Sequence, residues 1–144
     1  MAVADVAIRR DPAGLPQLVT MLAHGSAVVR YWAALGCLML GPSAQSASAV
    51  LAGRLSDSSA AVQGAAAHAL CRTGRADLGL PVLCQQLAAG GVAVRLRAAN
   101  ALGELGELAR PGLPALQTAR SDPDPNVRRA AAHTVAVLDG SYAP

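Results

Sequence analysis

Few side chains in this 144-residue sequence could act as nucleophiles or bases, and the strongest pair is one cysteine with one histidine. A reactive cysteine needs a lowered thiol pKa and a base within reach. Cys71 lies beside Arg72 and three residues after His68, so a His68–Cys71 pair could form on one helix face. We expect Cys71 to be partly exposed and expect Cys37 and Cys84 to pack at apolar positions. No further converging groups accompany the pair, so we predict no catalytic residue and no enzyme.

The histidines are placed unfavourably for a metal site. His68 and His133 each lie six residues into a helix of a repeating unit, two units apart, on the same exposed face. At about 9–10 Å per layer of helices, their side chains would lie about 20 Å apart. Ligands of one metal ion cannot be so distant. We therefore interpret both as solvated surface histidines, and we predict no metal and no cofactor.

One pattern recurs four times along the chain and must position these side chains. Its leading valines recur at nearly equal intervals, and in the first three units a glycine occupies the twelfth position after the valine. A glycine at that place suits the left-handed conformation that ends helices. A shorter helix precedes each valine, and in three units a proline at the thirteenth position before the valine favours its first turn. The valines are Val29, Val62, Val94 and Val127, and the prolines are Pro16, Pro81 and Pro114.

Within each longer helix, mostly small apolar residues occupy the fourth, eighth and eleventh positions after the valine, which form one stripe on an α-helix. One helical hairpin cannot bury such a stripe alone, whereas stacked hairpins can. The composition agrees, because apolar residues make up 53% of the chain and aromatic residues only 2%. We predict an all-α, right-handed α-solenoid within one domain, 1–144. Its parts are an N-terminal helix over 2–10 and repeats over about 15–41, 47–74, 80–106 and 113–139.

The repeated core Val-Arg-x-x-Ala-Ala, preceded in two units by Asp57 or Asp122, resembles the short HEAT-like repeats named after phycobilisome lyases. The resemblance covers essentially the whole chain and implies the fold rather than one function. The segments 15–18 and 29–36 resemble, more narrowly, the C-terminal HEAT extension of some bacterial sulfatases. That resemblance implies a non-catalytic module beside a catalytic domain.

Arginine follows the leading valine in three units. We predict that Arg30, Arg95 and Arg128 form a ladder with the loop aspartates Asp57, Asp122 and Asp124.

The two ends of the chain differ. The last short helix carries Gln117 and Arg120 where earlier units have apolar residues, which predicts a closing cap. Residues 2–10 resemble the second half of a preceding unit and could leave an apolar edge of Val3, Val6, Ala7 and Ile8. Three interpretations stay open: this helix is itself a cap, the chain was cut from a longer protein, or a partner, such as a second copy of the chain, covers the edge.

A candidate binding surface follows from the third, sixth and tenth positions after each valine, which we expect on the concave side. In the first unit these positions are apolar, and Tyr31 lies beside them. Large aromatic residues are enriched at binding hot spots. Two interpretations of Trp32 stay open, a contact residue or an internal plug against residues 2–10. The predicted binding residues are Tyr31, Trp32, Leu35, Met39, His68, Arg72, Arg97, Asn100 and Glu104.

We therefore predict a scaffold for a protein partner or for a fused catalytic domain. Two alternatives stay open: a subunit of a chromophore or prosthetic-group lyase that uses His68–Cys71, and a nucleic-acid binder that uses Arg72, Arg97 and Arg129. We do not expect nucleic acid, because the net charge is only +3 and the lining is mixed in charge. No apolar run approaches the roughly 20 residues of a membrane span. As given, the chain is expected in the cytoplasm, or outside it if it belongs to a secreted sulfatase.

Overall fold

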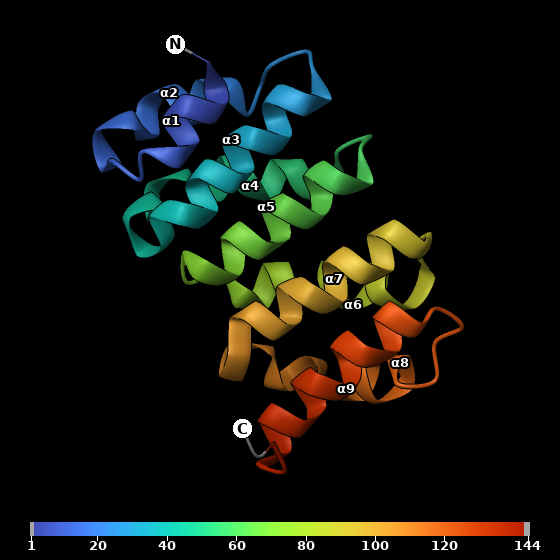
Figure 1. The fold of residues 1–144 in the computed structure, drawn as a ribbon. Helices are drawn as coiled ribbons and strands as arrows, with labels where there is room; N and C mark the ends of the chain where they lie inside the picture. The colour runs from blue at the N-terminus through green and yellow to red at the C-terminus, as the bar shows by residue number, and fades with distance from the viewer. Residues whose placement is uncertain (1, 143–144) are drawn as a thin grey trace. The chain divides into compact units, whose positions relative to one another are not determined.

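The computed structural model describes residues 2–142, and every regular element in that range is a helix. Figure 1 shows the helices following one another as hairpins. The predicted all-α solenoid of helical hairpins is confirmed. The chain divides into two compact units, residues 1–79 (unit 1) and 80–144 (unit 2), and each is described by itself.

Each repeat has a first and a second helix, and the first is the shorter one except in the third repeat, where both have 14 residues. The N-terminal helix α1 spans Val3–Ile8, and the long second helices of the four repeats are α3, Ala27–Leu40, α5, Ala60–Arg72, α7, Val92–Leu105, and α9, Pro125–Asp139. The first helices are α2, Leu15–Met21, α4, Ser48–Gly53, α6, Ala76–Ala89, and α8, Leu113–Ala119. The 3-10 segments are η1, Pro12–Gly14, η2, Gly41–Ala47, η3, Arg54–Ser56, and η4, Gly106–Gly112.

Each second helix begins two residues before its leading valine, not at the valine. The residue three before the valine has an extended backbone and acts as the N-cap. Ser59 and Asp124 accept hydrogen bonds from backbone N–H groups of the first turn with their side chains, which are partners that helix starts require. The caps are Ser26, Ser59, Gly91 and Asp124.

The repeated glycines end the second helices as predicted. Gly41, Gly74, Gly106 and Gly140 all have positive φ. Gly41 and Gly106 have φ 57° with ψ −129° and −127°, a conformation that side-chain-bearing residues avoid. Arg10, just after α1, also has a positive φ of 53°.

The third repeat departs from the predicted pattern in its first helix. Pro16 and Pro114 lie in the first turns of α2 and α8, whereas Pro81 lies inside α6. In the other repeats a 3-10 segment precedes the short helix, but here residues 76–79 are already α-helical. The helix therefore starts four residues before the predicted position 80.

Small residues in the second helices make the core of unit 1. Ala33, Cys37 and Leu70 are buried with Leu18 and Leu51 of the first helices. A Cβ atom on Gly36 would lie 2.8 Å from a methyl carbon of Leu18 and 3.2 Å from the Cα atom of Ala7. Gly36 therefore allows α1 and α2 to pack directly on α3.

Unit 2 has the same construction. Its core holds the buried stripes of α7 and α9 with leucines of the first helices, and α7 packs on α9. Gln117 and Arg120 on α8 are exposed, so the polar outer face predicted for the last repeat is confirmed. The buried residues include Leu83, Leu87, Ala98, Leu102, Leu116, Val127, Ala131 and Val135.

The open apolar edge predicted for the N-terminal helix is largely closed. Val6 and Ala7 are buried because α1 packs on α3, and Val3 packs against the same core. Ile8 is 62% exposed. The helix therefore covers the first repeat as a cap, and a second copy is not needed to bury Val6 or Ala7.

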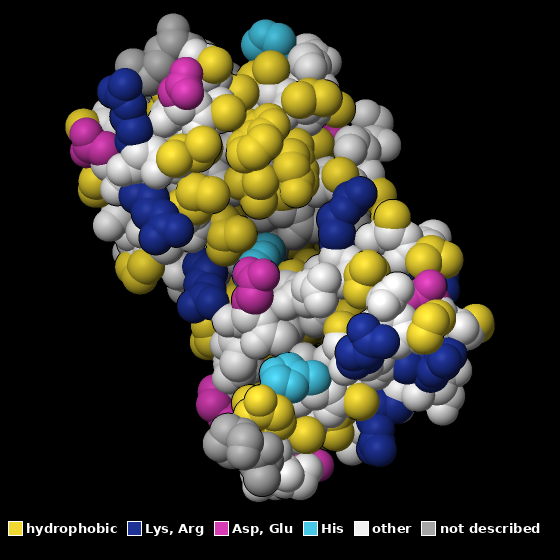
Figure 2. Space-filling view, in the orientation of Figure 1, with side chains coloured by type: hydrophobic (Ala, Val, Ile, Leu, Met, Phe, Trp, Pro, Cys, Tyr) yellow, Lys and Arg dark blue, Asp and Glu magenta, His cyan; other side chains and the backbone are white. Residues whose placement is uncertain are grey.

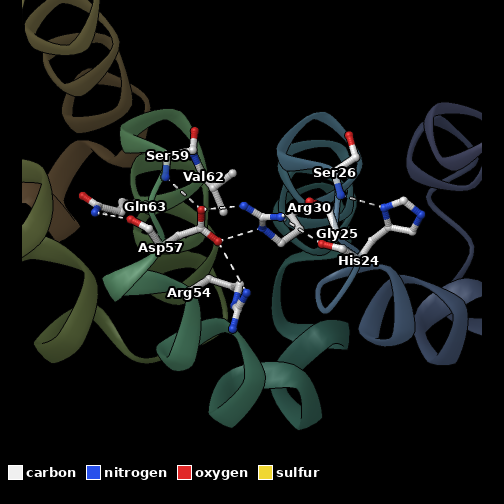
Figure 3. A network of polar contacts seen from close by, with 9 residues as sticks. All are labelled: His24, Gly25, Ser26, Arg30, Arg54, Asp57, Ser59, Val62 and Gln63. Carbon is white, nitrogen blue, oxygen red and sulfur yellow. Dashed lines mark hydrogen bonds and ion pairs between the residues drawn. The ribbon is translucent and has the colours of Figure 1, made fainter.

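An arginine of one repeat reaches an aspartate of the next within unit 1. Nε and Nη2 of Arg30 on α3 donate to Asp57 at 2.8 and 2.9 Å, and both side chains are almost fully buried. Nη1 of Arg30 also donates to the carbonyls of His24 and Gly25, and Asp57 accepts from the N–H of Ser59 (Figure 3). The guanidinium therefore ties together α3, its own preceding loop and the start of α5.

Unit 2 repeats this pair with Arg95 and Asp122, at 2.8 and 3.0 Å. These two rungs of the predicted ladder are confirmed. Arg128 instead donates to the carbonyls of Asp122 and Pro123 in its own loop, and Asp124 caps α9.

The second and third repeats carry Gln63 and Ala89 at the corresponding positions. The arginine–aspartate pattern is therefore not repeated in the sequence at these positions.

The segment Ala27–Ser56 is long and apolar enough to span a membrane by length and composition alone, with a mean hydropathy of 1.3. It turns at Gly41 and contains the buried Arg30. Its apolar residues pack against α1, α2 and α5, which accounts for the hydropathy.

The Arg30–Asp57 pair should contribute to stability. We expect Asp57→Asn to lower the free energy of unfolding at pH 7 by about 2 kcal/mol. The guanidinium of Arg30 would stay buried, but the negative charge that it pairs with would be gone. The guanidinium of Arg30 holds the pKa of Asp57 below its ordinary value of 3.8. The stabilisation is therefore present above that value and is lost as the pH falls through the folded-state pKa. Urea unfolding from pH 7 to pH 3 measures both effects. Asp77→Asn, which breaks an exposed pair with Arg75, is the control and should change little.

The positive φ of Arg10 predicts a stabilising substitution. We expect Arg10→Gly to raise the free energy of unfolding by about 0.5–1 kcal/mol, because glycine adopts this conformation without strain. Arg9→Gly, at a neighbouring residue with φ −63°, should lower it. The midpoints of urea unfolding of the two variants measure these changes. Equal effects of the two substitutions would contradict a strained backbone at Arg10.

Candidate functional site

Apolar side chains form a line along α3 that unit 2 does not have. Val28, Trp32, Leu35 and Met39 follow one another at spacings of four, three and four residues, so they share one helix face, named here the α3 stripe. Val28 is 66% exposed and Met39 is 36% exposed. Our sequence reasoning missed Val28 because it started the helix at Val29, although its spacing from Trp32 was visible.

The middle of the α3 stripe is half-buried. Tyr31 and Leu35 pack against the core of unit 1, and the ring of Trp32 meets that of Tyr31 edge-on, with centroids 6.2 Å apart. Figure 2 shows hydrophobic side chains gathered in one patch over α1 and α3 of unit 1. The predicted residues Tyr31, Trp32, Leu35 and Met39 therefore lie together on one helix.

His68 on α5 is not the solvated histidine that we expected. It is only 7% exposed, and most of α5 is buried, from Ala65 to Cys71. Burial, with a smaller effect of the charge on Arg72, lowers the pKa of His68 to about 4. The expectation was wrong because it gave every second helix one exposed side, whereas the alanines of α5 allow close packing around it. Arg72 and His133 are exposed as predicted.

The cysteines are packing residues in this structure. Cys71 is 2% exposed, and its Sγ lies so close to Gly79 that a Cβ atom there would be 2.6 Å from it. The expected partly exposed thiol at Cys71 is therefore wrong. Burial raises the pKa of Cys37 to about 11 and also raises that of Cys84. These two thiols stay protonated near neutral pH.

Unit 2 has a polar groove between α7 and α9. It has a volume of about 380 Å³, and its floor is made by alanines, Gly103 and Thr134. A Cβ atom on Gly103 would lie 2.9 Å from Oγ1 of Thr134. A larger residue at position 103 would therefore collide with Thr134 at the bottom of the groove. The structure brings the predicted residues Asn100 and Glu104 together here with His133. The predicted residue Arg97, one turn before Asn100 on α7, does not line the groove.

The predicted site residues are thus divided between the two units. In unit 1, Tyr31, Trp32, Leu35 and Met39 lie on α3, and His68 and Arg72 lie on α5. In unit 2, Asn100 and Glu104 line the groove. Within residues 2–142, no three His, Cys, Asp or Glu side chains are placed to hold a metal ion.

The lowered pKa of His68 predicts a loss of stability in mild acid. The unfolded chain takes up a proton near the ordinary value of 6.5, whereas the folded chain does so only near pH 4. Stability therefore falls as the pH drops from 6.5 towards 4, by up to about 2 kcal/mol between pH 6.5 and 5 at roughly 1.4 kcal/mol per unit.

The measurement is urea unfolding at several pH values. His68→Gln should remove this part of the pH dependence, because glutamine does not titrate. The matched control is His133→Gln, at the equivalent and exposed position of α9, which should keep it. An unchanged pH profile in His68→Gln would contradict a histidine buried in its neutral form.

Comparison with known proteins agrees with this fold. Residues 80–142, which lie in unit 2, match the family model described as HEAT repeats. No curated protein matches the chain.

Two engineered proteins have similar structures. The crystal structure of one engineered protein superposes with a TM-score of 0.65 at 22% identity, covering 89% of this chain and 63% of the other. A designed armadillo repeat protein in complex with the peptide (KR)4 superposes with a TM-score of 0.66 at 17% identity, covering 94% of this chain and 72% of the other. The chain thus spans less than two thirds of the first of these proteins, and at such identities the likeness shows the fold alone.

Proposed function

We propose that the chain is a non-enzymatic repeat scaffold that binds a polypeptide partner through the α3 stripe. The observation that carries the proposal is an apolar line on α3 at positions where α7 carries Ala93, Arg97, Asn100 and Glu104. Four repeats share one buried stripe, so the fold requires apolar residues there. It places no such requirement on the opposite positions, because α7 folds with polar residues at them.

Binding of a partner would explain why the side chains of the α3 stripe are apolar. Clustered apolar side chains at a surface are typical of protein interaction sites, and tryptophan and tyrosine bring large contact areas at a low cost in conformational entropy. The edge-on contact between Tyr31 and Trp32 restrains both rings before a partner arrives. Preorganised side chains lose less entropy on binding.

A non-enzymatic role is supported by the state of the candidate nucleophile. Cys71 is buried and its predicted base His68 has a pKa of about 4, so neither is presented to a substrate at the surface. The lyase alternative depended on that pair and loses its support. The narrower form of the proposal, in which the partner is a sulfatase-type catalytic domain of the same polypeptide, is supported only by the sequence resemblance.

The proposed contact surface includes other predicted residues. Arg72 extends it in unit 1, and Arg97, Asn100 and Glu104 contribute separately in unit 2, because all four side chains are exposed. His68 is left out because it is buried.

Trp32→Ala tests the proposal. We expect it to weaken binding of the partner by about 2 kcal/mol, or roughly 30-fold, because a half-buried ring at the centre of the stripe is removed. The partner is identified by cross-linking to the tagged chain in cell extract, and its dissociation constant is then measured by calorimetry. Leu108→Ala, which removes an exposed leucine in unit 2, is the control and should bind like the unmodified chain.

Thermal unfolding of the same variants separates contact from packing. If Trp32→Ala lowers the melting temperature strongly and leaves the affinity of the refolded chain unchanged, Trp32 is an internal plug and the proposal fails.

A further inference from the structure

Unit 1 exposes few large apolar side chains. Within residues 2–79 they are Ile8, Val28 and Met39, and the last two belong to the α3 stripe. Single apolar residues scattered over a surface are ordinary, whereas several on one side are typical of an interaction site. The direction of Ile8 therefore matters, because it tells whether the α3 stripe has an apolar neighbour on α1.

The residues before Ile8 fix the orientation of α1. Val6 faces the segment before α2, since a Cβ atom on Gly14 would lie 3.1 Å from a methyl carbon of Val6. Ala7 faces α3, since a Cβ atom on Gly36 would lie 3.2 Å from the Cα atom of Ala7. Successive residues are about 100° apart around a helix, so Ile8 lies about 160° around α1 from Val6. Its side chain therefore points away from α2.

The α3 stripe also points away from the first helices. Cys37 is fully buried in the core that it shares with Leu18 of α2. Val28, Leu35 and Met39 lie about 160–180° around α3 from Cys37. Because α1 packs directly on α3, Ile8 and the α3 stripe form one apolar surface, named here the α1–α3 face (Figures 1 and 2).

The α1–α3 face offers almost no hydrogen-bond partners. Among its five large side chains, only the indole of Trp32 has an N–H group. A polypeptide that buries its backbone here must therefore pair its own N–H and C=O groups, because unpaired buried groups are costly. An α-helix pairs them within itself. An extended segment needs a neighbouring strand, and residues 2–142 contain none.

The spacing of the α3 stripe also matches a helix. Its residues are separated by four, three and four positions, and this alternation is the seam pattern of paired helices. At about 1.5 Å per residue, the stripe from Val28 to Met39 is about 16 Å long, or three turns of helix. Apolar side chains of an opposing helix recur at the same interval and therefore pack between those of the stripe.

We propose that the α1–α3 face binds a short amphipathic α-helix of a partner polypeptide, with apolar residues at intervals of three and four. The inference rests on the proposed function and deepens it. It names the conformation and the residue pattern of the partner segment, and it adds Ile8 to the contact surface.

A second copy of the chain fits this face less well than one helix does. A stable dimer buries about 800 Å² on each partner, through about 20–30 residues. The α1–α3 face has far fewer large side chains, and Trp32 and Leu35 are already half-buried within their own unit. Three turns of one helix cover a surface of this length.

The test uses the full chain and its single tryptophan, Trp32, whose emission moves to shorter wavelength when the ring is covered. The probes are peptides of about 14 residues without tryptophan, with leucine, isoleucine, valine or methionine spaced four, three and four apart. Glutamate and lysine fill the other positions, and a hydrocarbon link on the polar side holds each peptide helical. We expect members of this set to shift the emission of Trp32.

A control set of peptides has the same composition and the same link. Its apolar residues stand at alternate positions, which places them on opposite sides of the helix. We expect no shift of the Trp32 emission with this set.

Two exposed valines provide matched variants. Val28→Ser and Val137→Ser remove the same side chain from second helices of unit 1 and unit 2, where the residues are 66% and 44% exposed. We expect Val28→Ser and Ile8→Ser each to weaken binding of the tightest helical peptide at least about threefold, and Val137→Ser less than about 1.5-fold. Fluorescence anisotropy of the labelled peptide gives the dissociation constants.

Four outcomes would overturn the inference. They are no shift with any helical peptide, an equal shift with the control set, equal losses in Val28→Ser and Val137→Ser, and a larger shift with phosphatidylcholine vesicles than with any peptide. Sedimentation of the chain alone adds a fifth, because a dimer that Val28→Ser dissociates would assign the face to a second copy.

The two proposals fail separately. If no helical peptide binds while the partner from cell extract is still captured in a Trp32-dependent way, the helix inference is wrong and the scaffold stands. If the helical peptides bind as expected while capture does not depend on Trp32, the captured partner uses another surface. The proposed function then fails, and the α1–α3 face still binds helices.

Discussion

The structure depends on burying a stripe of small residues that no single helical hairpin can cover. The second helices present alanine, cysteine and leucine at their buried positions, so their surfaces are shallow and helices can approach closely. Gly36 is the extreme case, because a methyl group there would collide with Leu18 and with the backbone of α1. Each repeat is thus stable only when a neighbour covers its stripe. The short α1 fits this rule, since it buries Val6 and Ala7 against α3 in place of a complete preceding repeat.

The packing of small apolar residues alone does not fix the position of one repeat along the helix axes of the next. The arginine–aspartate pairs within each unit fix that position. Arg30 and Arg95 use one edge of the guanidinium for an aspartate of the following repeat and the remaining nitrogen for the carbonyls of their own loop. The planar geometry of the pair leaves little freedom in its position. The second repeat carries Gln63 in place of the arginine and the third carries Ala89 in place of the aspartate, so the sequence pattern of this pair is not repeated there.

Function is proposed where the repeats differ rather than where they agree. The buried stripe is nearly the same in four helices, whereas the opposite positions are apolar on α3, mostly polar on α7 and mixed on α9. One fold thus carries two surfaces of different chemistry, the apolar α3 stripe and a polar groove between α7 and α9. The engineered proteins share this fold at only 17% and 22% sequence identity. Such low identity is expected if the fold requires only the buried residues to be similar, because the outer residues can then vary.

The sequence by itself determined the features that depend on neighbours within a few turns or on the repeat period. These are the four hairpins, the glycines that end them, the polar last helix and the partners of Arg30 and Arg95. Only the tertiary structure decided how deeply the outer positions are buried. His68 and His133 occupy equivalent places in the repeat, yet one is buried and the other exposed. The helical period tells which side chains share a face. Whether that face meets water depends on the side chains packed around it, and these come from segments far away in the sequence.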